Sequence, residues 1–476
     1  MVASEAVPFI KTGGLADVIG SLPPALKERG EDVAVVLPRY GDAKLEESRC
    51  VLERLPVWLG NTCYPARVDL SVVRDVPYYL VDCPSLFDRD GVYTDKEVDF
   101  PDNHVRFAML SRAALAIARR VFRPRIFHCH DWQAALVPVY LRGTLAGDPT
   151  FMGVKSLLTI HNLGYQGLFP SSTLSELGLE RSVFHMGGLE FFGKVNFLKG
   201  GISYSDAIST VSPTYATEIQ TPEYGCGLEG VLRARQGVLT GILNGADYAE
   251  WDPATDPHLK ARYSAEELGG KRACKQDLLR QFGLPAEALE RPLIGIVSRL
   301  VAQKGFDLVE EMAPELASEE LSLVALGTGD PRYERLFQEL AAVYPGKIGV
   351  RLAYDNALAH KIEAGADMFL MPSRYEPCGL NQIYSLRYGT VPVVRATGGL
   401  DDTIDESTGF KFKEYSGPAL LAAIRAALAA FSNRSRWRRV MLDGMRKDYS
   451  WKTSAAEYSA LYRRLSPESR VRLKSS

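Results

Sequence analysis

One segment of this 476-residue chain combines a buried strand, a rigid turn and a helix within about twenty positions. The apolar run 368–371 (MFLM) has the composition of a strand buried on both faces, and it ends at Pro372. Pro377 disfavours helical geometry at Glu376, and residues 380–388 then have the composition of a helix. A single carboxylate is therefore predicted between the carboxyl end of a strand and the amino end of a helix.

In open α/β sheets, ligands bind at this kind of strand-to-helix turn. A helix amino end favours phosphate, but the carboxylate of Glu376 would repel a phosphate, so sugar hydroxyls suit it better. A capped turn that binds nothing would have the same local sequence. The turn alone therefore leaves a ligand-binding and a purely structural interpretation open.

A second strand-to-helix turn carries two cations. The apolar run 293–297 predicts a strand, and Arg299 and Lys304 follow it. Both charges can converge on one anion, such as a diphosphate, although two isolated cations could also be surface charges. The segment 397–399 (TGG) follows another predicted strand, and its backbone N–H groups could also hold phosphate.

The first half of the chain contains comparable strand ends. Residues 1–4 (MVAS) predict a short first strand at the centre of a sheet, followed by 11–17 (KTGGLAD). The glycine pair in this segment lets a backbone approach a ligand, but a glycine pair beside a lysine is by itself more often a structural turn. A later strand ends at Asp131, where a carboxylate can accept hydrogen bonds from two sugar hydroxyls. The next ends at His161; a lone histidine is more often a satisfied core group than a ligand.

Two patterns could indicate metal chemistry. His128 and His130 share one face by strand alternation, as in metallohydrolases, and Asp88 and Asp90 form an Asp-x-Asp motif. A metal site needs further ligands, and no second cluster of histidine and aspartate follows in the sequence. The Asp-x-Asp motif lies among polar turn residues, which is typical of a solvated loop. We therefore predict no metal site.

The remaining elements follow from apolar spacing. We expect strands at 33–37 and 77–82, with irregular sequence between them, and helices at 15–29, 104–121, 271–282, 418–431, 434–448 and 453–465. The 476 residues suffice for two or three domains. The fold class is therefore α/β, with the strand-to-helix unit present in both halves.

Several motifs together resemble one known family. These are VASE (2–5), KTGGLAD (11–17), SRYEPCGLNQ (373–382) and RATGGLDDT (395–403). They are similar, in the same order, to motifs of bacterial glycogen synthases and plant starch synthases, and the resemblance extends to about residue 462. Members of that family are retaining glycosyltransferases of the GT-B architecture, in which two Rossmann-like domains face a deep cleft.

The resemblance implies a domain plan and a reaction. The implied domains are an N-terminal Rossmann-like domain over 1–240, a C-terminal nucleotide-sugar domain over 241–450, and a crossover helix with tail over 451–476 that packs on the first domain. The implied reaction transfers glucose, with retention, from ADP-glucose to the non-reducing end of glycogen or another α-1,4-glucan. Cationic side chains would stabilise the departing ADP, so no cofactor and no metal is expected.

The resemblance also implies a set of site residues. Those implied in catalysis are Glu376, His161, Arg299, Lys304 and Asp131. Those implied in substrate binding are Lys11, Gly14, Asp17, Tyr93, Asn244, Tyr354, Cys378, Gly379, Leu380, Thr397, Gly398 and Gly399. Tyr354 matches a base-stacking position but could be an aromatic at the core edge, and Tyr93 is expected near the acceptor glucan. Tyr384 stands where some related retaining transferases have a second glutamate.

Composition and charge limit which other classes of protein the chain can belong to. The net charge of −2 gives no field that attracts nucleic acid or acidic membranes, and no apolar run approaches a membrane span. The start lacks a signal-peptide pattern, and seven scattered cysteines without CxxC pairs predict a reduced cytoplasm, or a plastid for a plant enzyme. Two rivals stay open: a sucrose- or trehalose-type synthase with a small acceptor, and a non-catalytic glucan-binding protein. Neither the choice between ADP-glucose and UDP-glucose nor the oligomeric state follows from the residues.

Overall fold

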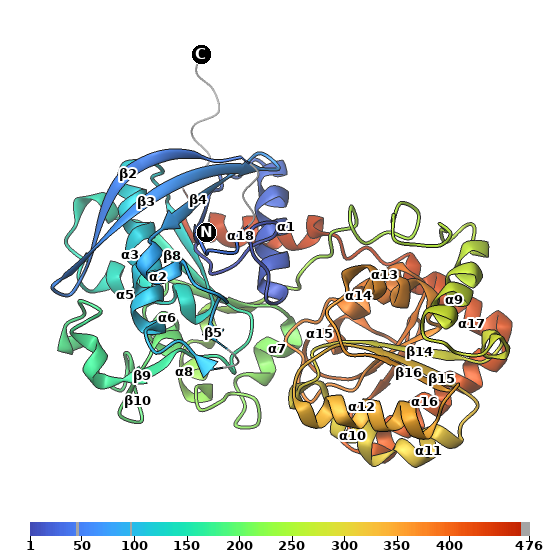
Figure 1. Cartoon of the computed structure of the whole chain (residues 1–476). Coiled ribbons are helices and arrows are strands. Elements are labelled where there is room, and N and C mark those ends of the chain that lie inside the picture. Colours follow the sequence, from blue (N-terminus) through green and yellow to red (C-terminus); the bar gives the residue numbers. More distant parts are fainter. Residues whose placement is uncertain (44–46, 96–97, 468–476) are drawn as a thin grey trace. The chain divides into compact units, whose positions relative to one another are not determined.

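The computed structural model describes residues 1–43, 47–95 and 98–467, and it divides the chain into two compact units (Figure 1). Unit 1 comprises Met1–Gly245 and the segment from Trp451 onward, and unit 2 comprises Ala246–Ser450. The chain thus passes into unit 2 after residue 245, and the family resemblance implied a boundary after residue 240. Part of the expected C-terminal segment, residues 468–476, lies outside the described residues.

Unit 2 is built on a parallel sheet of six strands in the order β16-β15-β14-β17-β18-β19. The strands are β14 (Leu293–Val297), β15 (Ser322–Leu326), β16 (Ile348–Arg351), β17 (Met368–Met371), β18 (Val391–Arg395) and β19 (Phe410–Phe412). Counted along the unit, this order is 3-2-1-4-5-6, that of the Rossmann fold, which reverses between its first and fourth strands. The reversal in unit 2 lies between β14 and β17.

Helices cover both faces of this sheet (Figure 1). They are α9 (Gly269–Gln281), α10 (Phe306–Glu311), α11 (Ala313–Ser318), α12 (Pro331–Val343), α13 (Asn356–Gly365), α14 (Asn381–Arg387), α15 (Gly398–Thr403), α16 (Gly417–Ser432) and α17 (Arg434–Met445). Strand alternation divides the core: Met368 and Leu370 of β17 pack with α10, α12 and α16, whereas Phe369 and Met371 pack with α9, α13 and α14. The strand predicted from the apolar run 368–371 is confirmed.

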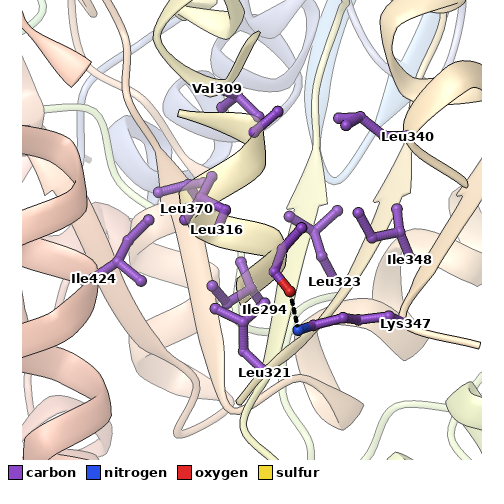
Figure 2. A pocket seen from close by; sticks show the side chains of 12 residues that line it. Ile294, Val309, Leu316, Leu321, Leu323, Leu340, Lys347, Ile348, Leu370 and Ile424 are labelled. Carbon is purple, nitrogen blue, oxygen red and sulfur yellow. Dashed lines mark hydrogen bonds between the residues drawn. The ribbon is translucent and has the colours of Figure 1, made fainter. Parts of the chain in front are cut away.

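A small apolar pocket lies in the first of these cores, between β14, β15, β16 and the helices α10, α11, α12 and α16 (Figure 2). Its one charged lining residue, among the described part of the chain, is Lys347, whose Nζ donates to the carbonyl of Ala317 at 2.5 Å. Lys347 precedes β16, so the pocket is near the amino ends of the strands. Its lining residues offer no set of polar groups suited to a sugar nucleotide, and the turns predicted to bind one follow the carboxyl ends of the strands.

Unit 1 contains a larger sheet made of two four-stranded parts. Their strand orders are β2-β3-β4-β1 and β7-β8-β12-β13. Its strands are β1 (Val35–Pro38), β2 (Arg49–Leu59), β3 (Thr62–Val73), β4 (Val76–Asp82), β7 (Ile126–His130), β8 (Lys155–Ile160), β12 (Ala207–Thr210) and β13 (Leu239–Gly241). Three short strands, β9 (Leu168–Pro170), β10 (Glu190–Phe191) and β11 (Lys194–Asn196), form a separate small sheet, and β5 (Thr94–Asp95) pairs with β6 (Val98–Asp99).

Val2 joins the two halves of the large sheet. It forms parallel bridges to Val36 of β1 and to Cys129 of β7, and its N–H donates to the carbonyl of His128 at 2.8 Å. The first strand therefore lies at the centre of the sheet, as predicted, but only this one residue has ladder partners on both sides. Around it the order again reverses, so unit 1 has its own Rossmann-type reversal, between Val2 and β7.

The prediction of irregular sequence between 37 and 77 is wrong. Strands β2 and β3 form a long antiparallel hairpin there, and β3 pairs with β4. The proline pair Pro56 and Pro65 face each other in this hairpin, and β2 lies at the edge of the sheet. Prolines and many charged residues indicate a loop, yet an edge strand such as β2 tolerates both because it needs fewer ladder bonds and has one side facing water. Pro65 belongs to β3, but it lies outside the part of β3 that pairs with β4.

The helices of unit 1 include the segment that returns from unit 2. They are α1 (Gly14–Glu28), α2 (Pro84–Phe87), α3 (Asn103–Arg120), α4 (Asp131–Ala134), α5 (Leu136–Arg142), α6 (Phe197–Tyr204), α7 (Pro213–Glu218), α8 (Glu229–Ala234) and α18 (Trp451–Leu465). Trp451 and Tyr458 of α18 pack with Val18 and Leu22 of α1, so the crossover helix does return to the first unit. No helix within the described ranges is long and apolar enough to cross a membrane, and all seven cysteines are unpaired.

Candidate active site

The reversal of strand order in unit 2 brings two separately predicted turns together. The strands β14 and β17 are neighbours, so the turns at their carboxyl ends are adjacent. Lys304 follows β14 and Glu376 follows β17, and their Nζ and Oε2 atoms form an ion pair at 2.6 Å. Both side chains are largely enclosed, with 19% and 7% of the side-chain surface exposed. The structure thus places a paired cation and carboxylate where Rossmann-type sheets bind ligands.

Hydrogen bonds between the two turns hold this pair. The N–H of Arg374 donates to the carbonyl of Gln303 at 2.8 Å, and the Gln303 side chain donates to the carbonyl of Tyr375 at 3.2 Å. Ser373 Oγ also donates to Glu376 Oε2 at 3.0 Å. The Glu376 carboxylate therefore accepts from two side chains, and hydrogen bonds between the two turns hold the backbone that carries it.

Glycines allow this close packing. A Cβ at Gly305 would lie 2.0 Å from the Pro372 carbonyl oxygen, and one at Gly398 would lie 1.9 Å from that of Glu376. Gly399 is similarly tight, because a Cβ there would lie 2.1 Å from the Cys378 carbonyl oxygen. The Gly305 and Gly398 backbones also have left-handed φ angles of +74° and +46°, which favour glycine.

The structure gives the 397–399 segment a different contact from the predicted phosphate cradle. The N–H of Gly399 donates to the carbonyls of Glu376 and Pro377, both at 3.2 Å. The Gly399 N–H is therefore already used within the protein. It could hold phosphate, as expected, only if these hydrogen bonds broke. In this structure the glycines press against the turn that carries Glu376.

A second glycine pair supports the turn that carries Arg299. Gly327 and Gly329 follow β15, and added Cβ atoms there would meet the carbonyl oxygens of Ser298 and Leu300 at 1.9 and 2.4 Å. The Leu300 N–H donates to the Thr328 carbonyl at 2.8 Å. These glycines therefore fix the backbone on both sides of Arg299.

Arg299 and Tyr354 are both exposed at this edge of the unit 2 sheet. Tyr354 follows β16 and exposes 79% of its surface, which excludes the alternative of an aromatic at the core edge. Cys378 is buried, whereas Gly379 and Leu380 are half-buried at the start of α14. Tyr384, within α14, is buried and stacks on Trp251 with ring centroids 4.0 Å apart, so it acts there as a packing residue.

The reversal in unit 1 likewise gathers predicted residues. After Val2, the buried carboxylate of Glu5 accepts hydrogen bonds from the N–H groups of Thr12 (2.5 Å) and Gly13 (3.1 Å). This contact holds the loop that carries Lys11, whose Nζ pairs with Asp17 Oδ1 at 2.7 Å. Glu5 was not among the predicted site residues; the VASE motif contained it, but nothing local indicated its long-range partners.

Gly14 differs from the glycines of unit 2. A Cβ added at Gly13 or Gly14 would meet no other atom within 4 Å, and neither residue has a left-handed φ angle. The fold of unit 1 therefore does not require these two glycines. Open space at a glycine pair, beside a lysine and at the start of α1, is what close approach of a ligand to the backbone needs.

Asp131 lies directly after β7 in a strained conformation. Its φ angle is +55°, which is unusual for a residue other than glycine, and its Oδ1 accepts from the N–H of His161 at 2.7 Å and of Asn162 at 3.4 Å. Burial raises the pKa of Asp131 to about 7, against the effect of these two hydrogen bonds. The carboxyl group is thus held at the strand tip and can change its charge near neutral pH.

The three strand-tip histidines form one cluster. His128 and His130 share a face of β7, as predicted, with ring centroids 4.1 Å apart, and His130 Nδ1 lies 3.0 Å from His161 Nε2. The two His128 ring nitrogens contact the hydroxyls of Tyr462 at 2.7 Å and Thr159 at 2.6 Å. Both are therefore engaged, which argues against the metallohydrolase alternative. His130 was considered only as a metal ligand; its contact with His161 needs the pairing of β7 with β8 to be recognised.

Two predicted substrate contacts lie in less open surroundings. The Tyr93 hydroxyl is within hydrogen-bond distance of Ser4 Oγ at 2.7 Å and donates to Glu5 Oε1 at 3.0 Å, so it braces the loop of Glu5. Asn244 is buried, and no described residue hydrogen-bonds its Oδ1. A buried amide oxygen without a donor is costly, and a ligand or water molecule could supply one.

Comparison with known proteins gives the class. The starch synthase catalytic domain family matches residues 1–234, and the glycosyl transferases group 1 family matches residues 281–440. The catalytic domain of Starch Synthase IV from Arabidopsis thaliana, solved with ADP and acarbose, has a TM-score of 0.89 and 33% identity, covering 98% of each chain. A sucrose-phosphate synthase from Thermosynechococcus elongatus shares the fold, with a TM-score of 0.62 at 17% identity. The chain is thus a glycosyltransferase of the GT-B architecture.

Relatives in sequence narrow this class. The chain is 53% identical to a glycogen synthase of Koribacter versatilis, covering 97% of this chain and 96% of that protein. It is 50% identical to a glycogen synthase of Anaeromyxobacter dehalogenans, covering 98% and 99%. The chain therefore belongs to the glycogen synthase family, and the resemblance inferred from the sequence motifs is confirmed.

Proposed function

We propose that this glycosyltransferase moves glucose, with retention of configuration, from ADP-glucose to the non-reducing end of an α-1,4-glucan, and that it needs no metal ion. The observation that carries the proposal is the Lys304–Glu376 ion pair at the strand reversal of unit 2. The structural relative bound to ADP and acarbose supports ADP as the nucleotide part of the donor.

Lys304 and Arg299 would hold the donor diphosphate. As the glycosidic bond breaks, negative charge builds on the departing ADP, and fixed cations stabilise that charge more in the transition state than in the ground state. In this structure Lys304 pairs with Glu376 instead. Donor binding would therefore place the lysine between the carboxylate and the diphosphate. Glu376 would then be able to accept hydrogen bonds from the sugar hydroxyls as well.

Unit 1 supplies groups for the transferred sugar. Asp131 can accept hydrogen bonds from glucose hydroxyls, and His161 lies beside it on the next strand. Retention in a glycosidase would require two carboxylates about 5 Å apart, one of them a nucleophile. No second carboxylate adjoins Glu376 in the sequence, which favours attack from the same face as the leaving ADP. The seven free thiols are consistent with a reducing cytoplasm.

The deciding experiment compares donors and products. Initial rates with ADP-glucose and UDP-glucose on a glycogen primer, followed by NMR of the new linkage, test the donor, the acceptor and the stereochemistry together. We expect a faster rate with ADP-glucose and an α-linked product. A β-linkage, a disaccharide product, or glycogen binding without consumption of ADP-glucose would contradict the proposal.

Replacement of the exposed aromatic Tyr354 should weaken donor binding specifically. If its ring stacks on adenine, Tyr354→Ala should raise KM for ADP-glucose about tenfold, within the roughly 1–3 kcal/mol that alanine substitution of a stacking aromatic costs. Tyr354→Phe should behave as the wild type. Because Tyr354 is 79% exposed, its removal should leave the melting temperature unchanged. Trp58, 54% exposed in unit 1, is the matched control, and Trp58→Ala should leave KM unaltered.

The raised pKa of Asp131 predicts a pH dependence. Only the ionised carboxylate accepts two hydroxyl hydrogen bonds, so kcat/KM should rise with pH and level off above about 7, the folded-state pKa. Asp131→Asn keeps the size of the side chain but cannot ionise, so its kcat/KM should be lower and should lack this rising limb. An unchanged limb in the asparagine variant would assign the titration to another group and remove this role from Asp131.

A further inference from the structure

We propose that His130 is a positioning residue: it donates its Nδ1 proton to His161 Nε2, so that His161 carries its own proton on Nδ1 and meets the sugar as a hydrogen-bond donor. This inference rests on the proposed function of His161. It concerns a residue that the mechanism above does not use, and it gives the buried histidine cluster a task beyond packing.

The geometry leaves open which of the two rings, His130 or His161, carries the proton of the hydrogen bond between them. His130 is fully buried, and its Nδ1 lies 3.0 Å from His161 Nε2. Within the described part of the chain, nothing hydrogen-bonds His130 Nε2. The second ring nitrogen of His161, Nδ1, likewise has no hydrogen-bond partner among the described residues, although its backbone N–H is fixed by Asp131. The two imidazole rings therefore share one hydrogen bond, and each ring has one further nitrogen that takes no part in it.

Both rings are neutral, so the internal hydrogen bond holds a single proton. Burial lowers the pKa of His161 to about 3 and that of His130 well below its ordinary value, and the nearby His128 ring and the amino terminus lower the latter further. The proton can belong to either ring. If it belongs to His161, then His130 carries its own proton on Nε2; if it belongs to His130, then His130 Nε2 is bare.

The arrangement in which His130 carries the shared proton has the smaller cost of burying an unpaired polar group. A proton on His130 Nε2 would be a buried donor without an acceptor, and unpaired buried N–H groups are rarer in proteins than unpaired acceptors. A bare Nε2 leaves only an acceptor lone pair unpaired. The His128 ring, 4.1 Å away and anchored by Tyr462 of α18, keeps His130 in this orientation. The proton is therefore on His130 Nδ1, and His161 is left as the Nδ1–H tautomer.

Nitrogen NMR of the intact, substrate-free protein tests the tautomer directly. The chain has seven histidines, so ¹⁵N-histidine labelling gives few signals, and the single variants His161→Gln and His130→Asn identify the two of interest. We expect His161 to show a protonated Nδ1 and a bare Nε2, and His130 to show the same pattern. A protonated Nε2 on His161 overturns the proposal. This NMR measurement needs no catalytic activity, so its result stays valid even if the proposed transfer reaction is wrong.

Kinetics then separate positioning from packing. Asparagine can place an amide N–H near the position of His130 Nδ1, whereas leucine cannot, so His130→Leu should lower kcat/KM about tenfold and His130→Asn should restore most of it. In a His161→Ala background, His130→Leu should cost nothing further, because the group it acts through is gone. Equal losses in both backgrounds would show a merely structural role and contradict the inference. Should His130→Leu fail to fold, the asparagine variant and the NMR assignment still decide.

Discussion

Lys304→Ala is expected to lower kcat/KM for glucosyl transfer about 30- to 1,000-fold, equivalent to roughly 2–4 kcal/mol of lost transition-state stabilisation. The ammonium group is the cation that the structure holds in place at the strand reversal of unit 2, 2.6 Å from Glu376. Without it, the charge that develops on the leaving ADP would lose a preorganised partner. Arg299→Ala should act in the same direction through the second cation.

Loss of Lys304 also leaves the enclosed carboxylate of Glu376 without its counter-ion, which by itself destabilises a fold. Two further variants separate this effect from catalysis. Lys304→Met combined with Glu376→Gln removes both charges and should recover thermal stability without recovering activity. Lys361 pairs with Asp277 at 3.6 Å elsewhere in unit 2, and Lys361→Ala should leave transfer intact. Near-normal transfer by the Arg299→Ala, Lys304→Ala double variant would remove both cations from the mechanism.

Gly398→Ala is expected to reduce transfer about 100-fold, although position 398 has no reacting group. A Cβ there would lie 1.9 Å from the carbonyl oxygen of Glu376, so the turn that carries this carboxylate must shift. A displacement of about 1 Å in a catalytic geometry can cost 10²-fold. Gly305→Ala, whose Cβ would meet the Pro372 carbonyl oxygen at 2.0 Å, should have a similar effect from the opposite turn.

The control for Gly398→Ala is a glycine that shares its backbone conformation but not its contacts. Gly283 has a φ angle of +67°, and a Cβ there would meet nothing within 4 Å. Gly283→Ala should therefore lose about 1–2 kcal/mol of stability from the left-handed conformation alone and keep its activity. If Gly398→Ala is as active as Gly283→Ala, the close packing around Glu376 does not set the catalytic geometry.

The sequence predicted the strand ends well, because a buried parallel strand has a distinctive composition. The run before Pro372 and the run before Arg299 are continuous and apolar, and their turns begin with proline or polar residues. The location of the candidate site then follows from a general property of open α/β sheets. What the sequence could not predict is that Lys304 and Glu376, 72 positions apart, form an ion pair, because this depends on which strands are neighbours.

Other failures have the same origin. The β2–β3 hairpin is an edge feature whose prolines and charges are compatible with a loop, and only its pairing with β4 shows it to be sheet. The glycines at 398 and 399 were interpreted as phosphate donors because a glycine-rich turn exposes N–H groups. In the structure their lack of a side chain matters more, since two carbonyl oxygens occupy the space. Long-range contacts of Glu5 and His130 were likewise invisible to local patterns.

The most direct test of the account is the rate at which labelled glucose passes from ADP-glucose into glycogen in the presence of excess EDTA. If Lys304 and Arg299 carry the charge of the departing nucleotide, the rate should be the same with and without the chelator. A transfer reaction that stops in EDTA and returns when manganese is added would contradict the account.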